Sequence, residues 1–247
     1  MNARWFGSPN FSTGRAGFRP EAIVIHIMQG TLEDTDSWFG ATRSSVSAHY
    51  GIGRDGEIHQ YVAEGDTAWH AGRVNSPSWP MIKQGVNPNL YTIGIEHEGH
   101  TGDAWTTELL ETSSSVIAEV ATRWGIRIDA DHVVSHASIY APKSFCPGSG
   151  VQLTNLIARA RAKVEAGQPP NFVDMPGTVA TRTAVNVRKG VANTHGTVVR
   201  VVPAGARLDV VGWTSAGESV HGNSHWYGDA DGNFVWAGAT DQPVPTA

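Results

Sequence analysis

Residues Ile23-Val24-Ile25-His26-Ile27-Met28 form an apolar run that contains one histidine. A short continuous run of this kind is typical of a strand buried on both faces in the middle of a sheet. Thr92-Ile93-Gly94-Ile95-Glu96 predicts a second central strand, and Val133-Val134 a short third strand. We therefore expect a buried sheet, with His26 inside it and Glu96 at the end of one of its strands.

Helical patterns lie between these strands. Leu109, Leu110, Val116, Ile117, Val120 and Ala121 have helical spacing between Thr106 and Gly125, and residues 151–165 show a similar pattern. A shorter helix is expected from about Asp34 to Arg43, and a hairpin with its turn at Arg54-Asp55-Gly56. Strands that alternate with helices predict an α/β domain with a mixed central sheet flanked by helices.

The sequence pattern changes after residue 166. Gly167-Gln168-Pro169-Pro170-Asn171 indicates a linker over residues 167–177, so the first domain is expected to span residues 1–166. Residues 178–247 contain short Val-rich segments with tight turns and no helical periodicity. About five such strands predict a small all-β barrel. The expected strands are 185–188, 198–202, 208–213, 225–228 and 233–236.

Composition excludes several classes of protein. Charged residues make up 17% of the 247 residues and the formal net charge is −5, with no run of Lys or Arg, so we expect no nucleic-acid partner. No apolar run approaches the roughly 18 residues of a membrane span. Met1-Asn2-Ala3-Arg4-Trp5-Phe6 does not start a signal peptide. We expect a chain made in the cytoplasm, or one whose leader has been removed.

Cys146 is the single cysteine, and His136 lies ten residues before it. Together with His26, these residues offer one thiolate and two imidazoles, which is a suitable ligand set for a catalytic zinc ion with a fourth position left open. Glu96 is then the candidate general base, and Lys143 the candidate group that stabilises negative charge in the transition state. Each of these residues also has a structural interpretation without a metal site. Cys146 could be a buried free thiol and His26 a core histidine. Glu96 could be a salt-bridge partner and Lys143 a solvated loop residue.

Three further side chains are candidates for substrate binding. His49 lies in an expected strand, and Trp69 and His70 open a long polar loop. Each can either contact substrate or make structural hydrogen bonds. His97 and His132 are near the candidate ligands in sequence and are therefore possible rival ligands.

Residues 20–165 resemble the type 2 N-acetylmuramoyl-L-alanine amidases, which are zinc amidases related to peptidoglycan recognition proteins. The similar segments follow in the family's order: Ile23-Val24-Ile25-His26, Val46-Ser47-Ala48-His49-Tyr50-Gly51-Ile52, Arg54-Asp55-Gly56, Ala68-Trp69-His70-Ala71-Gly72, Thr92-Ile93-Gly94-Ile95-Glu96, Val134-Ser135-His136 and Cys146-Pro147-Gly148. Residues 178–240 are similar to bacterial SH3-type domains, with Val185-Asn186-Val187-Arg188 as the best match.

The resemblance implies that His26, His136 and Cys146 bind Zn²⁺ and that Glu96 is the general base. It implies a peptidoglycan hydrolase in which zinc activates water to cleave the amide between N-acetylmuramic acid and L-alanine. Two departures from the family occur here. Lys143 is three residues before Cys146 rather than two, with Phe145 as an apparent insertion, and Ala48 stands where some relatives have tyrosine.

Two other functions are compatible with these residues. A recognition protein would bind peptidoglycan without cutting it, and a cysteine peptidase would use Cys146 as nucleophile and His136 as base. The resemblance favours the amidase, and the missing signal peptide favours a phage endolysin released to the cell wall over a bacterial autolysin.

Overall fold

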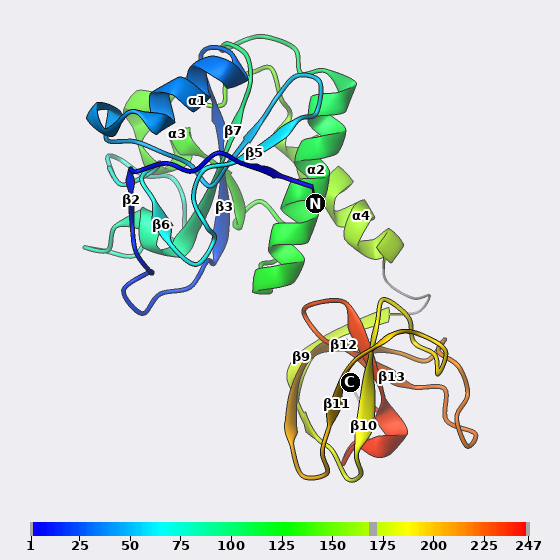
Figure 1. Ribbon diagram of the computed structural model, residues 1–247. Helices are drawn as coiled ribbons and strands as arrows, with labels where there is room; N and C mark the ends of the chain where they lie inside the picture. The colour runs from blue at the N-terminus through cyan, green and yellow to red at the C-terminus, as the bar shows by residue number, and fades with distance from the viewer. Residues whose placement is uncertain (1, 168–171, 246–247) are drawn as a thin grey trace. The chain divides into compact units, whose positions relative to one another are not determined.

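The computed structural model describes residues 2–167 and 172–245, which form two compact units (Figure 1). The first unit spans Met1–Lys163 and the second Val164–Ala247. No helix among the described residues is both long and apolar enough to cross a membrane.

A six-stranded sheet in the order β1-β5-β4-β7-β3-β8 is the centre of the first unit. The adjacent pairs β4–β7, β7–β3 and β3–β8 are parallel, as is β1–β5, while β5 is antiparallel to β4. The mixed sheet expected from the sequence is therefore confirmed. The strands are β1 (Arg4–Trp5), β3 (Ala22–Ile27), β4 (Tyr50–Ile52), β5 (Ile58–Gln60), β7 (Thr92–His97) and β8 (Val133–Ser135).

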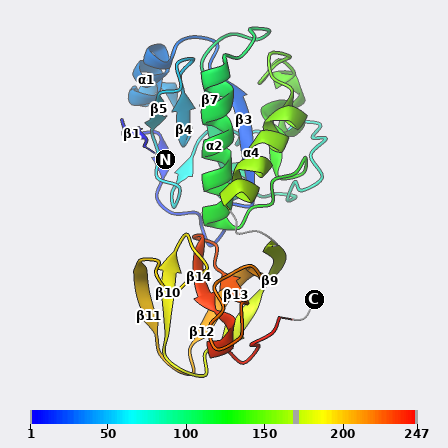
Figure 2. The same ribbon diagram turned by 90° about the vertical axis from the view of Figure 1, so that its right-hand side faces the viewer.

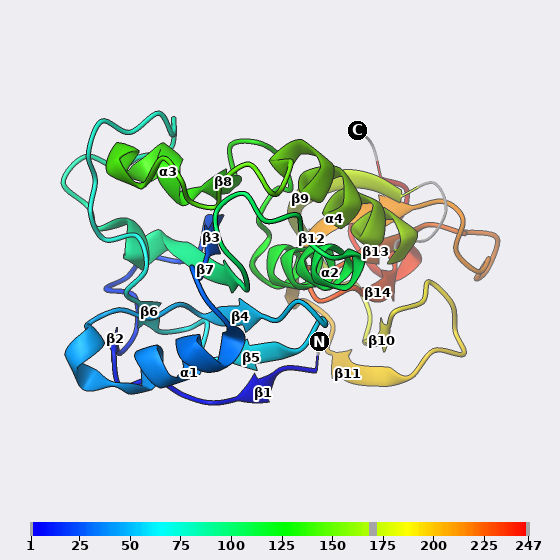
Figure 3. The same ribbon diagram turned by 90° about the horizontal axis from the view of Figure 1, so that it is seen from above.

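Side chains along β3 and β7 alternate between a face that packs in the core and a face that carries the site. Ile23, Ile25, Ile93 and Ile95 pack on one face against α2 (Thr107–Trp124) and α4 (Leu153–Gly167), which lie across the sheet in Figure 2. Because side chains alternate in a strand, the residues between these isoleucines belong to the opposite face. That face carries α1 (Leu32–Gly40) and α3 (His136–Ile139), as Figure 3 shows.

The chain before β3 wraps around the first unit and holds part of the site face. Arg15 is buried and donates hydrogen bonds to the carbonyl oxygens of Glu64, Asn89, Leu90 and Thr92. The short strand β2 (Phe11–Ser12) pairs with β6 (Thr67–Ala68). These contacts tie the loop after β5 and the start of β7 to the N-terminal segment.

The second unit is a six-stranded antiparallel sheet in the order β11-β10-β14-β13-β12-β9. The five strands expected from the sequence correspond to β10 (Val185–Lys189), β11 (Val198–Val202), β12 (Arg207–Thr214), β13 (Trp226–Gly228) and β14 (Asn233–Trp236). The sixth, β9 (Phe172–Ala180), pairs along β12 and includes residues 172–177, which the sequence assigned to a linker. Residues 168–171 of that expected linker lie outside the described residues.

Candidate metal centre and active site

Three neighbouring segments bring His26, His136 and Cys146 together. His26 is near the carboxyl end of β3, and His136 is the first residue of α3, directly after the parallel strand β8. The Ala137 N–H donates to the carbonyl of Cys146, which ties the cysteine loop to the start of α3. The site therefore lies at the carboxyl ends of parallel strands, where open α/β sheets bind their ligands.

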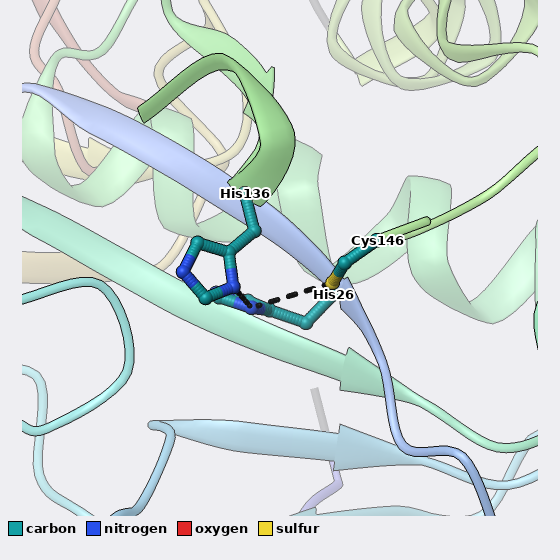
Figure 4. A group of neighbouring side chains, drawn as sticks. All are labelled: His26, His136 and Cys146. Carbon is teal, nitrogen blue, oxygen red and sulfur yellow. Dashed lines mark hydrogen bonds between the residues drawn. The ribbon is translucent and has the colours of Figure 1, made fainter. Parts of the chain in front are cut away.

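The donor atoms of these residues converge, as Figure 4 shows, and all lie within 4.8 Å of one another. His26 Nδ1 lies 3.1 Å from His136 Nδ1 and 3.9 Å from Cys146 Sγ. Tetrahedral zinc with ordinary bond lengths would hold two nitrogens about 3.4 Å apart, and a nitrogen and a sulfur about 3.6 Å apart. The two separations measured from His26 are therefore close to those of a zinc site.

The protonation of the two imidazoles also suits a metal. Burial lowers the pKa of His26 well below its ordinary value, and the neighbouring His136 lowers it further. Burial, followed by the charge of Lys143, lowers the pKa of His136 to about 4. Both rings are therefore neutral at pH 7 and can offer a nitrogen lone pair.

Burial has the opposite effect on the thiol, because it disfavours a charged thiolate. It raises the pKa of Cys146 to about 12, and the nearby carboxylate of Glu96 adds to this increase. Without a metal the sulfur keeps its proton at pH 7, so it is a poor nucleophile. This argues against the cysteine peptidase considered from the sequence.

Glu96 lies beside His26 in the paired strands β7 and β3. Its Oε2 atom is buried and has no hydrogen-bond partner among the described residues. Burial raises the pKa of Glu96 to about 8, and the charge of Lys143 opposes this increase. A buried carboxylate oxygen without a partner is costly, so its presence beside the triad points to a group that handles protons.

Lys143 remains at the site in spite of the apparent insertion. It lies in a 3-10 turn over Ala141–Lys143 and lines the same cavity as Glu96 and the triad. Its Nζ atom lies 5.1 Å from the centre of the Phe145 ring. The extra residue therefore adds an aromatic partner for the lysine beside the site.

A cavity of about 670 Å³ contains these groups. Four aromatic side chains without a predicted role also line it: Trp38, Phe39, Tyr140 and Phe145. Trp38 and Phe145 are 50% and 41% exposed. In the sequence, the available signal was an aromatic residue next to polar residues. Such a residue cannot be distinguished from a core residue before the fold is known.

The three predicted substrate contacts have different positions. Trp69 and His70 line the cavity, whereas His49 is fully buried and does not. His49 Nδ1 accepts the Gly94 N–H, and its Nε2 lies 3.3 Å from the carbonyl oxygen of Asp66 and 2.8 Å from Arg15. The buried ring of His49 therefore makes structural hydrogen bonds, and its contact with substrate stays a prediction.

Neither of the rival histidines joins the ligand cluster. His97 points to the helical face, where it contacts Ser113 and stacks on Trp105. His132 pairs with Asp129. Among the described residues, His26, His136 and Cys146 form the group with metal-ligand geometry.

Comparison with known proteins relates this chain to amidases. The profile of the family Amidase_2, N-acetylmuramoyl-L-alanine amidase, matches residues 16–149. N-acetylmuramoyl-L-alanine amidase A of Achromobacter lyticus is 36% identical over 122 residues, which cover 48% of this chain and 60% of that protein. The 1,6-anhydro-N-acetylmuramyl-L-alanine amidase AmpD of Citrobacter freundii is 30% identical over 164 residues, covering 59% of this chain and 83% of AmpD.

Solved structures show the same fold. A crystal structure of a selenomethionine AmpD derivative superimposes with a TM-score of 0.54 at 29% identity, over 66% of this chain and 94% of that one. A mutant structure of PlyL has a TM-score of 0.50 at 15% identity, over 66% of this chain and 99% of that one, which shows the fold alone. On the matched residues and the geometry of the triad, this chain belongs to the N-acetylmuramoyl-L-alanine amidase family Amidase_2.

Proposed function

We propose that the chain binds zinc through His26, His136 and Cys146 and hydrolyses peptidoglycan. The bond cleaved is the amide between the lactyl group of N-acetylmuramic acid and the L-alanine of the stem peptide. The observation that supports this most strongly is Glu96 Oε2, which has no hydrogen-bond partner among the described residues and belongs to the same cavity as the His-His-Cys triad. A protein that only binds peptidoglycan has no need for an acid with a buried, unsatisfied oxygen.

The residues of the chain divide the work of hydrolysis. Zinc held by His26, His136 and Cys146 would supply Lewis acidity, which would polarise the amide carbonyl and lower the pKa of water. Glu96 accepts the proton from the attacking water and later gives it to the leaving nitrogen of L-alanine. Lys143, which lines the cavity, offsets the negative charge that develops on the carbonyl oxygen.

The exposed aromatic side chains give the cavity a surface suited to a sugar-linked peptide. Trp38 and Phe145 present rings to solvent along its lining. Aromatic faces bury apolar area against the less polar faces of sugars, while the polar groups of the site remain free for the amide. We infer that these side chains hold the muramyl group beside Glu96.

The deciding experiment measures zinc content and the release of stem peptides from purified peptidoglycan. The wild-type chain should hold about one zinc and expose new L-alanine amino termini. Cys146→Ser should lose both, whereas Cys146→Asp, which keeps an anionic ligand, should retain part of both. Zinc binding without cleavage would contradict the amidase and favour a recognition protein, and cleavage by a zinc-free chain would exclude zinc hydrolysis.

We also propose that the second unit is an SH3-type domain that binds the cell wall. Its six antiparallel strands and Val-rich pattern, and its place as a separate unit after an amidase unit, support this assignment. The pairing of a hydrolytic unit with a separate β unit suits an endolysin, which reaches the wall after release from the cell. Lysis of cells by the protein added from outside would support that role, and failure to bind isolated walls would contradict it.

A further inference from the structure

A chain of hydrogen bonds starts at Nε2 of His26, the ring nitrogen that does not face His136 and Cys146. The Nε2 atom of His26 lies 3.1 Å from His70 Nδ1, and His70 Nε2 lies 3.3 Å from the hydroxyl oxygen of Thr92. That hydroxyl donates in turn to the carbonyl oxygen of Pro88, at 2.8 Å. The chain of hydrogen bonds therefore connects the candidate zinc ligand to a fixed backbone acceptor.

The number of available protons decides which group donates and which accepts in each of these hydrogen bonds. Because the single hydroxyl proton of Thr92 goes to Pro88, its oxygen can only accept from His70 Nε2–H. A neutral imidazole carries one ring proton, so His70 Nδ1 is an acceptor and His26 Nε2 must donate to it. His26 Nδ1 then carries a lone pair, and this is the atom that faces His136 and Cys146.

The surroundings of His70 leave its ring little freedom to leave this chain of hydrogen bonds. A Cβ at Gly94 would lie 2.5 Å from His70 Cγ, so the ring packs directly on the backbone of β7. The side-chain oxygen of Asn89 accepts the backbone N–H groups of His70 and Ala71. Thr92 is fully buried, so water does not replace its hydroxyl. Packing and hydrogen bonding therefore hold the same orientation.

We propose that His70, oriented by Thr92, is a positioning residue that fixes His26 in the tautomer required for metal binding. The inference rests on the zinc site of the proposed function and assigns a role to two residues outside the ligand set. Partners of this kind set the ring orientation and tautomer of metal-bound histidines, and their loss typically lowers metal affinity by about 10- to 100-fold.

The tautomer itself can be tested in the metal-free chain, on the matched pair Thr92→Ser and Thr92→Val. The histidine ring ¹⁵N chemical shifts report which nitrogen carries the proton. Wild type and Thr92→Ser should show His26 protonated at Nε2. Thr92→Val removes the hydroxyl acceptor for His70 Nε2–H and leaves only the backbone hydrogen bond of Thr92 to the His70 ring, so a population with His26 protonated at Nδ1 should appear. An unchanged His26 tautomer in Thr92→Val would overturn the proposal.

Zinc affinity, measured by competition with a chelator, gives a second test on His70. His70→Asn keeps an acceptor near the position of Nδ1 and should bind zinc within about threefold of wild type. His70→Ala leaves His26 Nε2–H without its partner and should bind about 10- to 100-fold more weakly. Equal affinity of these two variants would refute the role of His70.

The two tests also separate this inference from the proposed function. A wild-type chain that binds no zinc would contradict the zinc hydrolase, while the ring chemical shifts of the metal-free chain still decide the tautomer. A wild-type chain that cleaves peptidoglycan and binds zinc no more tightly than Thr92→Val would leave the hydrolase intact and overturn the positioning role alone.

Discussion

Cys146 and Glu96 both hold a proton at neutral pH in the metal-free chain, because burial raises the pKa of the first to about 12 and of the second to about 8. Binding of a divalent cation favours the charged form of both groups. The pKa values of His26 and His136 are lowered, so these rings have no proton to release at pH 7. Zinc binding at pH 7 should therefore release between one and two protons.

Calorimetry in buffers of different ionisation enthalpy measures this number. Glu96→Gln removes one of the two titrating groups, so the variant should release about one proton, from the thiol alone. Zinc affinity should increase with pH, by about tenfold per pH unit for each proton released. Equal proton release by wild type and Glu96→Gln would contradict the raised pKa of Glu96.

The same carboxylate should make the metal-free chain less stable at higher pH. An acid whose pKa is higher in the folded state stabilises the fold below its unfolded pKa, and this contribution is lost as pH rises from about 4.5 towards 8. A folded-state pKa that lies one pH unit above the unfolded-state pKa corresponds to about 1.4 kcal/mol. Glu96→Gln should therefore be more stable than wild type by a few kcal/mol at pH 9, and about equal at pH 4.

Urea unfolding of the two metal-free proteins at both pH values checks this difference. The variant should also cleave peptidoglycan at least about 100-fold more slowly, because it has no group to carry the proton. Together these results would show a residue kept for chemistry at a cost in stability. A stability difference that does not change with pH would rule out this explanation.

At the scale of the element, β7 has three consecutive site-face positions with different tasks. Thr92 orients His70, Gly94 leaves room for its ring, and Glu96 faces the cavity. Gly94→Ala should push the His70 ring away from His26. We expect a loss of stability of about 1–3 kcal/mol from overpacking, together with weaker zinc binding.

Gly65→Ala is the matched control, because a Cβ at Gly65 would have nothing within 4 Å. Thermal unfolding and chelator competition on both variants test the role of Gly94. If Gly94→Ala binds zinc as tightly as Gly65→Ala, the ring of His70 does not depend on this glycine.

The central elements were predictable because their sequences carry the required periodicity. The apolar run of β3 and the helical spacing of α2 gave positions close to those observed, and His26 and Glu96 followed from them. β9 was not expected, because most of its side chains are not buried and it contains Pro176 and Gly177. Its pairing with β12, a long-range contact, makes it a strand.

The site also depends on long-range contacts that a local sequence pattern does not show. Period two places Thr92, Gly94 and Glu96 on one face, so Thr92 could have been selected together with Glu96. The burial of His49 could not be anticipated, because it depends on Arg15, which is distant in sequence and covers it. A local pattern indicates which face a side chain takes, but the cover over that face comes from elsewhere in the chain.

At the scale of the whole molecule, the two units predict a separation of cleavage from wall binding. A chain that ends at Gly167 keeps all the site residues, since these lie between His26 and Cys146 in the first unit. It should therefore cleave a soluble muramyl peptide at close to the rate of the full chain. On intact cell walls it should be at least about tenfold slower, because the effective concentration given by a second binding site is lost.

Both rates are measured as released L-alanine amino termini, with the full chain as reference. The matched control adds a separate chain of residues 168–247, which carries β9 to β14 of the second unit. It should not restore the rate on walls, because it is no longer linked to the amidase unit. Equal rates of the truncated and full chains on walls would show that the second unit does not direct the enzyme there. A truncated chain that fails on the soluble peptide as well would show instead that the first unit needs the second to be active.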